Sequence, residues 1–424
     1  MPKGKKKGGK GRVSQPPSDD EYDTADNVST VSVQSEEHNS IPEEEGVDEA
    51  SAQENFEDKL KECIEGILQK SAQGRKSCLE GLTKALSKKC ISEFLMDRKM
   101  TVTDCLVRCI KKGRGEEQAL AAHCLSLMCI QLGLDIEDEI KAIKPQLMAT
   151  MTDNSAAVKG RAECALTLGI CHFLACSDID DVMKTMDALE GIFKLSYRKG
   201  DKSIPNITPD VCRLHSAALS SWSLLLSIAP SFLVDKLVES HIGKLPDLLL
   251  SKDVELRITA GETIALMYEL AREEDDEYEG ENIDDLIDTL KTLATDSQKY
   301  RAKKERRQQR SSFRDILRTV EIGESPENCI KFGRENFLID SWVKQNQYDA
   351  LCLALTSGIY QQLQDNVIVR EVFGLGEPLL PSAPGSSSKP SKWERTHYNA
   401  AVFKARTKVR SKHRDKRSVM INGD

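Results

Sequence analysis

The chain has 424 residues, and its 60 Lys and Arg against 68 Asp and Glu give a formal net charge of −8. Aromatic residues make up only 5% of it, a composition that favours helices over sheets. No stretch approaches the ~18 uninterrupted apolar residues of a membrane span, and no apolar segment follows the N-terminus as in a signal peptide. These features argue against a membrane or secreted protein, so we expect a soluble intracellular protein with reduced thiols.

Residues 1–54 are predicted to be disordered. The segment opens as MPKGKKKGGKGR, a basic leader of lysine and glycine, and continues as a long acidic stretch that is poor in apolar residues. Such a composition cannot bury enough apolar surface to offset the entropy of ordering the chain.

Residues 55–320 are predicted to be a succession of amphipathic helices with an internal repeat. The repeat is a polar residue, a small residue three positions later and an aliphatic residue four positions after that. It occurs as Arg75-x2-Cys78-x3-Leu82, Gln118-x2-Ala121-x3-Leu125, Arg161-x2-Cys164-x3-Leu168 and Arg257-x2-Ala260-x3-Ile264, with a weaker copy at Arg213. The copies start 43, 43, 52 and 44 residues apart, close to the roughly 40–47 residues of HEAT and armadillo repeats. We therefore predict an all-α, HEAT/armadillo-like α-solenoid.

Towards the end of this region the charges become segregated. Residues 273–285, EEDDEYEGENIDD, are strongly acidic and predict an exposed loop that leads into a helix. A basic stretch follows that ends in an apolar stripe of Phe313, Ile316, Leu317 and Val320. Its cations either form a second RNA contact or pair with the acidic stretch beside them. The candidate residues are Lys299, Arg301, Lys303, Lys304, Arg306, Arg307 and Arg310.

Residues 326–376 are predicted to be a small C-terminal domain, mainly helical. Residues 330–332 and 337–339 read as short strands, and Trp342, Tyr348 and Phe373 as core residues. Residues 377–391, EPLLPSAPGSSSKPS, have the composition of a flexible linker. Residues 392–417 are predicted to be a basic helix on this tether, and 418–424 a short tail.

The basic segment contrasts sharply with the rest of the chain. Residues 389–417 hold eleven Lys or Arg against Glu394 and Asp415, a local charge of +9, whereas residues 1–388 carry −16. On a helix the lysines from Lys404 and the arginines from Arg406 would form two stripes roughly 200° apart. Charge on nearly opposite sides suits a groove or channel with phosphates around it. A disordered basic tail and a nuclear-import signal are the alternatives.

The RNA-binding candidates on this segment are its cations and one aromatic residue that is able to stack on an unpaired base. They are Phe403, Lys404, Arg406, Lys408, Arg410, Lys412, Arg414, Lys416 and Arg417.

No catalytic, metal-binding or cofactor motif is found in the sequence. The thirteen cysteines include no C-x-x-C pair, and most fall on apolar helical positions where cysteine acts as a small hydrophobic residue. His172, between Cys171 and Cys176, is the nearest approach to a metal or nucleophile cluster, but its surroundings, TLGICHFLAC, predict a hydrogen-bonded core histidine. We expect no catalytic residue, no metal ligand, no cofactor and no small-molecule substrate.

Three stretches, LRITAGETIALMYELAR, LATDSQKYRAKKERRQQRSSFRDILR and HYNAAVFKARTKVRSKHRDKR, resemble the interferon-related developmental regulator family, and the resemblance runs from about residue 56 to 417. It implies a helical-repeat protein without catalytic activity. Members are described as transcriptional co-regulators associated with deacetylase-containing complexes, and as factors that bind ribosomes and silence translation. In the second role a C-terminal helix enters the RNA-lined mRNA and tRNA path, and residues 399–417 match it.

The resulting hypothesis is a ribosome-associated translational repressor whose partner is ribosomal RNA. The alternative is a nuclear scaffold that recruits co-repressor proteins and uses the basic segment as an import signal or nucleic-acid contact. The expected location is the cytoplasm, with the nucleus as the second compartment.

Overall fold

The structure, a computed structural model, describes residues 49–295, apart from 201, 202 and 204, and residues 302–379. The basic segment, most of the predicted linker and the leader lie outside these residues. The first helix, α1 (Glu49–Gly66), begins within the segment that we predicted to be disordered. The prediction was wrong for residues 49–54 because this acidic stretch, EASAQE, consists mainly of residues with good helix propensity.

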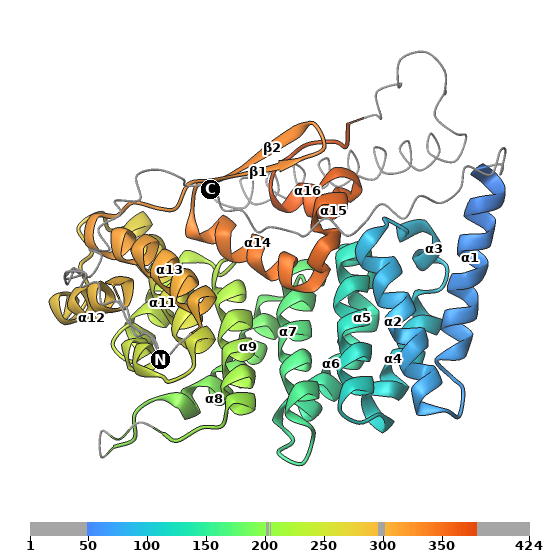
Figure 1. The fold of residues 1–424 in the computed structure, drawn as a ribbon, viewed down its shortest axis with the longest axis horizontal. Helices are drawn as coiled ribbons and strands as arrows, with labels where there is room; N and C mark the ends of the chain where they lie inside the picture. Colours follow the sequence, from blue (N-terminus) through green and yellow to red (C-terminus); the bar gives the residue numbers. More distant parts are fainter. Residues whose placement is uncertain (1–48, 201–202, 204, 296–301, 380–424) are drawn as a thin grey trace, which may run out of the picture. The chain divides into compact units, whose positions relative to one another are not determined.

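The helices of the solenoid form two rows (Figure 1). In the central row each helix packs against the next, and each helix of the flanking row packs against the central helix that follows it in the chain. The central row consists of α2 (Ala72–Lys88), α5 (Glu116–Leu132), α7 (Val158–Ala175), α9 (Pro209–Leu226), α11 (Val254–Glu274) and α13 (Lys303–Ile322). The flanking row consists of α1, α4 (Lys99–Lys112), α6 (Glu137–Thr152), α8 (Ile179–Phe193), α10 (Ser231–His241) and α12 (Ile283–Thr295), with the short α3 (Ser92–Met96) beside α5. Stacked helix pairs of this kind form an α-solenoid, so the predicted fold class is confirmed.

The sequence repeat coincides with the central row. Its aliphatic residues Leu82, Leu125, Leu168 and Ile264 are fully buried. They belong to one continuous core of buried side chains that runs through the stacked helices. A single helix pair leaves its apolar face exposed, so each pair is stabilised by its neighbours.

The polar residue that opens each of the four stronger copies has a structural role that the sequence pattern did not reveal. In these four its side chain donates to a main-chain carbonyl that precedes the helix, and so fastens the connection to the central row. Arg75 donates to Lys70 O (2.8 Å), Gln118 to Ile110 O (2.8 Å), Arg161 to Met151 O (2.9 Å) and Arg257 to Ser251 O (2.5 Å). Arg213 of the weaker copy differs, because it is exposed and donates to Asp210 Oδ1 (3.5 Å).

α13 carries a further copy of the repeat that sequence analysis missed. It reads Gln309-x2-Ser312-x3-Ile316, and Ile316 is fully buried. Gln309 Nε2 donates to Leu293 O (3.4 Å), and Gln309 Oε1 accepts from Arg257 Nη2 (2.5 Å). The copy was hidden because it begins within a run of charged and polar residues, RRQQRSS, instead of an apolar helical pattern. Phe313, Ile316 and Val320 are buried as predicted.

The C-terminal segment begins with a hairpin of antiparallel strands, β1 (Asn328–Phe332) and β2 (Glu335–Ile339), which confirms the two predicted strands. Three helices follow, α14 (Trp342–Leu355), α15 (Ile359–Asp365) and α16 (Val367–Val372). The predicted core residues Trp342, Tyr348 and Phe373 are 4%, 8% and 8% exposed, which confirms their assignment to the core.

This segment packs across the C-terminal ends of central-row helices (Figure 1). The last carbonyls of a helix lack partners within it, and here amide side chains of the C-terminal segment satisfy several of them. Gln362 Nε2 donates to the carbonyls of Leu86, Ser87 and Lys89 (3.1–3.2 Å), and Asn366 Nδ2 donates to Ile130 O (3.0 Å). We expected a small domain appended to the solenoid, but in the structure the segment shares the solenoid's hydrophobic core.

One stretch, Glu116–Thr152, is long and apolar enough by composition to cross a membrane. In the structure it is divided into α5 and α6, and 78% of the apolar window is buried inside the solenoid. Its hydrophobicity is therefore that of a core helix, and it gives only weak support for a membrane span.

Candidate functional site

Five of the seven residues that we predicted as a second basic contact lie in α13, and Lys299 and Arg301 lie outside the described residues. Of the five, Lys303, Lys304 and Arg307 are exposed, and Arg310 is half-buried. Arg306 differs, because it is half-buried and its Nε is enclosed without a hydrogen-bond partner in the described part of the chain.

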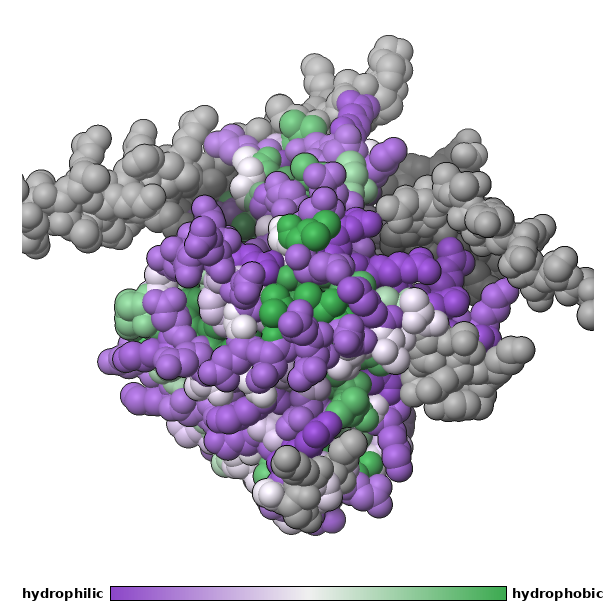
Figure 2. Space-filling model, turned by 90° about the vertical axis from the view of Figure 1, so that its left-hand side faces the viewer, coloured by the Kyte–Doolittle hydropathy of each residue, from purple (hydrophilic) through white to green (hydrophobic). Residues whose placement is uncertain are grey.

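Cations line one side of α13. At 100° per residue, five of them fall within an arc of roughly 80° around the helix axis. This arc lies away from the face on which Phe313 and Ile316 are buried. We call them the α13 stripe: Lys303, Arg307, Arg310, Arg314 and Arg318. Along the axis the stripe is about 22 Å long. Figure 2 views this end of the molecule, where the surface is mostly hydrophilic and the hydrophobic areas are small and separate.

The α13 stripe does not pair with the acidic residues 273–285 in the described structure. The ion pairs of α13 there are Lys291–Glu321 (2.9 Å) and Arg318–Glu324 (3.5 Å), both near its C-terminal end. The acidic loop lies too far from most of the stripe to pair with it. Arg272 donates to Tyr278 O and to the carbonyls of Thr319 and Val320, and these bonds hold the acidic loop beside the last turn of α13. Lys303 lies about 24 Å away along the helix axis.

The stripe lowers the stability of its own helix. Lys303 and Arg307, Arg310 and Arg314, and Arg314 and Arg318 are like-charged neighbours four residues apart. Each such pair is destabilising by about 0.2–0.5 kcal/mol, and lysines in the first turn also oppose the helix dipole. Burial raises the pKa of the nearby Asp315, a shift that the Arg318 and Arg314 charges oppose. These like-charged pairs do not stabilise α13, so the packing of the helix does not explain why the stripe is there.

The other predicted basic site, residues 403–417, lies outside the described residues. The structure does describe how the chain before it is held. Arg370 is 1% exposed, and its guanidinium forms a two-pronged ion pair with Glu335 (2.7 and 2.9 Å). It also donates to the carbonyls of Leu363, Leu375, Gly376 and Glu377 (2.8–3.2 Å). These bonds fasten the chain just before the predicted linker, and the sequence pattern had not singled out Arg370.

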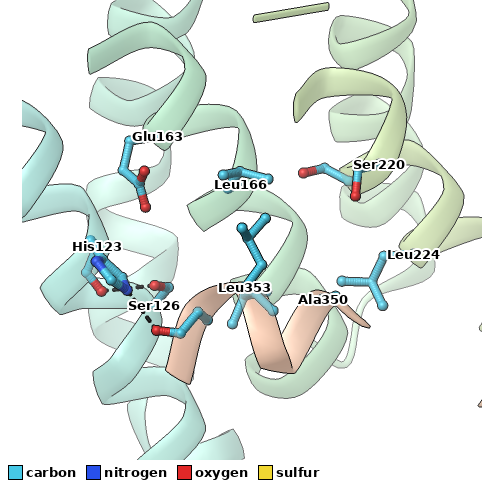
Figure 3. Close-up of a pocket in the computed structure, with 11 residues that line it drawn as sticks. His123, Ser126, Glu163, Leu166, Ser220, Leu224, Ala350 and Leu353 are labelled. Carbon is cyan, nitrogen blue, oxygen red and sulfur yellow. Dashed lines mark hydrogen bonds between the residues drawn. The ribbon is translucent and has the colours of Figure 1, made fainter. Parts of the chain in front are cut away.

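A groove lies between the C-terminal segment and the central row (Figure 3). Leu353 of α14 points from one side toward Leu166 of α7. His123 of α5 bonds to Ala354 O (2.7 Å) through Nε2, and Ser126 Oγ donates to His123 O (2.7 Å). Burial raises the pKa of Glu163 at the same groove, while the charges of His123 and Lys159 lower it. Because the imidazole and this hydroxyl bind main-chain carbonyls, they do not form a nucleophile and base pair.

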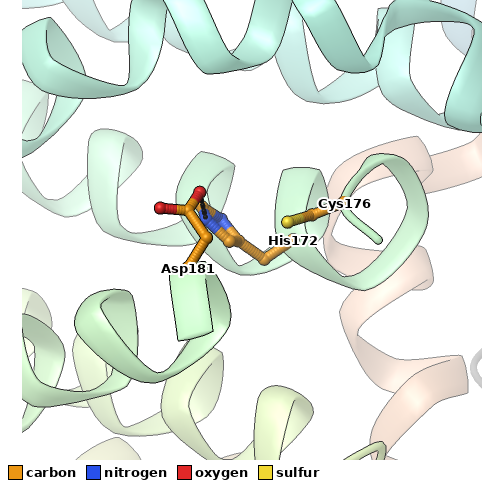
Figure 4. Close-up of side chains that lie close together, drawn as sticks. All are labelled: His172, Cys176 and Asp181. Carbon is orange, nitrogen blue, oxygen red and sulfur yellow. Dashed lines mark ion pairs between the residues drawn. The ribbon is translucent and has the colours of Figure 1, made fainter. Parts of the chain in front are cut away.

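The cluster of His172, Cys176 and Asp181 has donor atoms within 4.8 Å of one another (Figure 4). His172 is 1% exposed, as predicted for a core histidine, and bonds to Leu168 O (2.9 Å) through Nδ1 and to Thr185 Oγ1 (3.1 Å) through Nε2. Burial is the main cause that lowers its pKa. Lys144 Nζ lies 2.6 Å from Asp181 Oδ1, so a cation already neutralises this carboxylate. These contacts give the cluster a packing role between α6, α7 and α8.

The comparisons with known proteins identify the family. A family model described as "Interferon-related developmental regulator (IFRD)" matches residues 27–321, and one described as "Interferon-related protein conserved region" matches residues 366–418. This chain belongs to the interferon-related developmental regulator family. "Interferon-related developmental regulator 1" of Homo sapiens is 46% identical over 378 residues, covering 88% of this chain and 84% of that protein. "Interferon-related developmental regulator 2" of Mus musculus is 42% identical over 380 residues, covering 89% and 86%.

Likeness to solved structures is weaker. A "Designed armadillo repeat protein YIII(Dq)4CqI" is 14% identical with a TM-score of 0.37, covering 61% of this chain and 99% of that one. A crystal structure of a Kap121p mutant is 12% identical with a TM-score of 0.42, covering 74% and 32%. The solenoid architecture of this family member therefore rests on the helix packing described above.

Proposed function

We propose that this protein is a non-catalytic, ribosome-associated translational repressor. Its basic segment, residues 389–417, occupies the RNA-lined path of mRNA and tRNA and excludes them sterically. The observation that carries the proposal is the charge contrast between this segment, at +9, and residues 1–388, at −16. A segment of this charge is attracted to a polyanion that the rest of the chain repels.

The fastening of the chain by Arg370 supports the same proposal. It anchors residues 375–377 against α15 and β2, so the linker starts from a fixed point. Eleven residues lie between Glu377 and Lys389, and the twelve steps along the chain reach about 40 Å when extended. A solenoid bound at one place on a ribosome is thus able to deliver the segment to another.

Co-sedimentation with purified ribosomes across a salt series tests the proposal. The full chain is compared with a charge-reversed variant, Lys408→Glu, Arg410→Glu and Arg414→Glu, and with a chain that ends at Gly385. The matched control is Lys111→Glu, Lys112→Glu and Arg114→Glu, three exposed cations at the end of α4 that form no ion pair in the described residues.

We expect the full chain and the control to sediment with ribosomes, and the other two chains to be lost from the pellet at physiological salt. Eight neutralised phosphates give a log–log salt slope of about −6, on the single-strand factor of about −0.7 per contact. In a cell-free translation assay only the full chain and the control are expected to repress. Ribosome binding and repression that persist after charge reversal would contradict the proposal. Nuclear accumulation that depends on the same cations would favour the co-regulator scaffold instead.

A further inference from the structure

The α13 stripe is a second charged surface, and its geometry differs from that expected of residues 403–417. The basic segment is predicted to carry charge on nearly opposite sides of a helix. The stripe is one-sided, because Phe313, Ile316 and Val320 on the other face of α13 are fully buried in the solenoid. α13 is therefore a fixed helix with one exposed basic side, which suits a partner that it contacts along one line.

The burial around α13 argues against two kinds of partner. A helix that lies on a membrane needs an exposed apolar face, but Phe313, Ile316 and Val320 are buried, and Ile322 at the end of α13 is exposed by itself. A single-stranded nucleic acid is usually bound by aromatic side chains on which its bases stack. Phe313 is 0% exposed, and α13 has no other aromatic residue.

The remaining features fit the phosphate backbone of a duplex. Four of the five stripe residues are arginines, whose planar guanidinium groups bind phosphate oxygens through two parallel hydrogen bonds. Neighbouring cations are spaced about 4.5–6 Å apart along the axis, so they form a regular array like that of successive phosphates. Ser311, exposed beside the stripe, offers a hydroxyl for phosphate or 2′-OH contacts. Helical RNA is recognised mainly through such contacts and through shape.

We propose that α13 is a docking surface for a helical segment of RNA, whose phosphates bind Lys303, Arg307, Arg310, Arg314 and Arg318. The choice of RNA as the polyanion rests on the proposed function. The placement of the site rests on the structure alone. In this arrangement α13 holds the solenoid on duplex RNA while the basic segment reaches a separate, single-stranded path.

Fluorescence anisotropy with the full chain tests the inference. The probes are a blunt 20-base-pair RNA duplex, a DNA duplex of the same length and a 20-nucleotide poly(U) strand. The test variant is Arg307→Gln, Arg310→Gln and Arg314→Gln, and the matched control is Lys111→Gln, Lys112→Gln and Arg114→Gln. A third variant, Lys408→Gln, Arg410→Gln and Arg414→Gln, removes charge from the basic segment.

We expect the α13 variant to bind the RNA duplex at least roughly tenfold more weakly at physiological salt, and its log–log salt slope to be less steep by about 2.7, on about 0.9 per duplex phosphate contact. The affinity of the α13 variant for poly(U) is expected to remain within about twofold of that of the unmodified chain. The control variant is expected to stay within the same twofold range on all three probes. Thermal unfolding checks that the variant folds. Because the substitutions remove like-charge neighbours, its midpoint is expected to be equal or higher.

An α13 variant that binds the RNA duplex as well as the control does would overturn the inference. The inference would also be overturned if the unmodified chain bound the DNA duplex as tightly as the RNA duplex and the α13 variant lost both to the same extent. The surface would then bind duplex phosphates without a preference for RNA. The two proposals fail separately. Loss of duplex binding in the α13 variant supports the docking surface even when ribosomes do not retain the full chain. If the basic-segment variant no longer binds ribosomes but the α13 variant binds duplex RNA normally, the proposed function is supported and the docking surface is not.

Discussion

Replacement of Arg370 by methionine should loosen the part of the molecule from which the basic segment departs. Methionine has a similar length and an apolar stem but none of the five N–H donors of a guanidinium. All the contacts of the Arg370 guanidinium in the described structure are then lost together, which includes the two-pronged pair with Glu335 and four main-chain carbonyls.

The expected cost follows from burial. Removal of one partner from a buried ion pair costs about 3–5 kcal/mol, mostly because the other charge is left unpaired. The Glu335 side chain is 21% exposed, so water partly rehydrates its carboxylate, and we expect about 3 kcal/mol for Arg370→Met. Removal of the other partner, by Glu335→Ala, leaves the Arg370 guanidinium buried at 1% exposure without its counter-charge. This substitution should lower the free energy of unfolding at least as much as Arg370→Met.

The assay is a double-mutant cycle by urea unfolding, combined with hydrogen exchange of residues 359–379. Arg370→Met combined with Glu335→Ala should cost clearly less than the sum of the two single variants, with a coupling energy of about 1–3 kcal/mol. Exchange should accelerate in α15 and α16 and remain slow in α7 at the centre of the solenoid. Arg370→Lys should restore little, because an ammonium group has three donors and no planar fork.

A loss below about 1 kcal/mol in Arg370→Met, or strictly additive effects of the two substitutions, would contradict this role of Arg370. Either result would mean that water replaces the guanidinium contacts, and that Arg370 does not fix the starting point of the linker.

Three further predictions concern the solenoid. Burial, aided by the Arg161 charge, lowers the pKa of His215 to about 4; the unfolded chain therefore binds the proton first, and stability falls as pH drops below about 6.5. Between pH 8 and pH 5 the unmodified chain should lose about 2 kcal/mol more than His215→Gln in urea unfolding, and equal losses would exclude this origin. Burial and the charges of Asp349 and Glu255 raise the pKa of Glu262 well above its usual range, so Glu262→Gln should raise the melting temperature at pH 7.5, and a lower value would contradict the assignment. Leu168→Ala, at a fully buried position, should cost about 3–4 kcal/mol in chemical unfolding by opening a cavity, whereas a loss under 1 kcal/mol would mean that the core collapses into the space.

Much of the solenoid was predictable because its interactions are local and periodic. An aliphatic residue such as Leu125 or Leu168 faces the core whenever its helix stacks on a neighbour of the same design, so the interval of about 43 residues reveals the fold. The weakly apolar copy in α13 escaped detection because Gln309 is recognisable only by its bonds to Leu293 and Arg257. Helix-like periodicity also does not distinguish a separate domain from a segment that packs on the solenoid, as 326–376 does.

The helical repeat, the buried aliphatic positions and the contrast between an acidic body and a basic C-terminal segment could all be predicted from the chain of residues, because they are properties of composition and spacing. Which cations are structural and which are available to a partner could be read only from the folded contacts. Arg370 is enclosed by four carbonyls and a carboxylate, whereas Arg314 is exposed on α13. This is because the role of an arginine depends on the acceptors and the water around it, and contacts between residues far apart in the sequence place those acceptors.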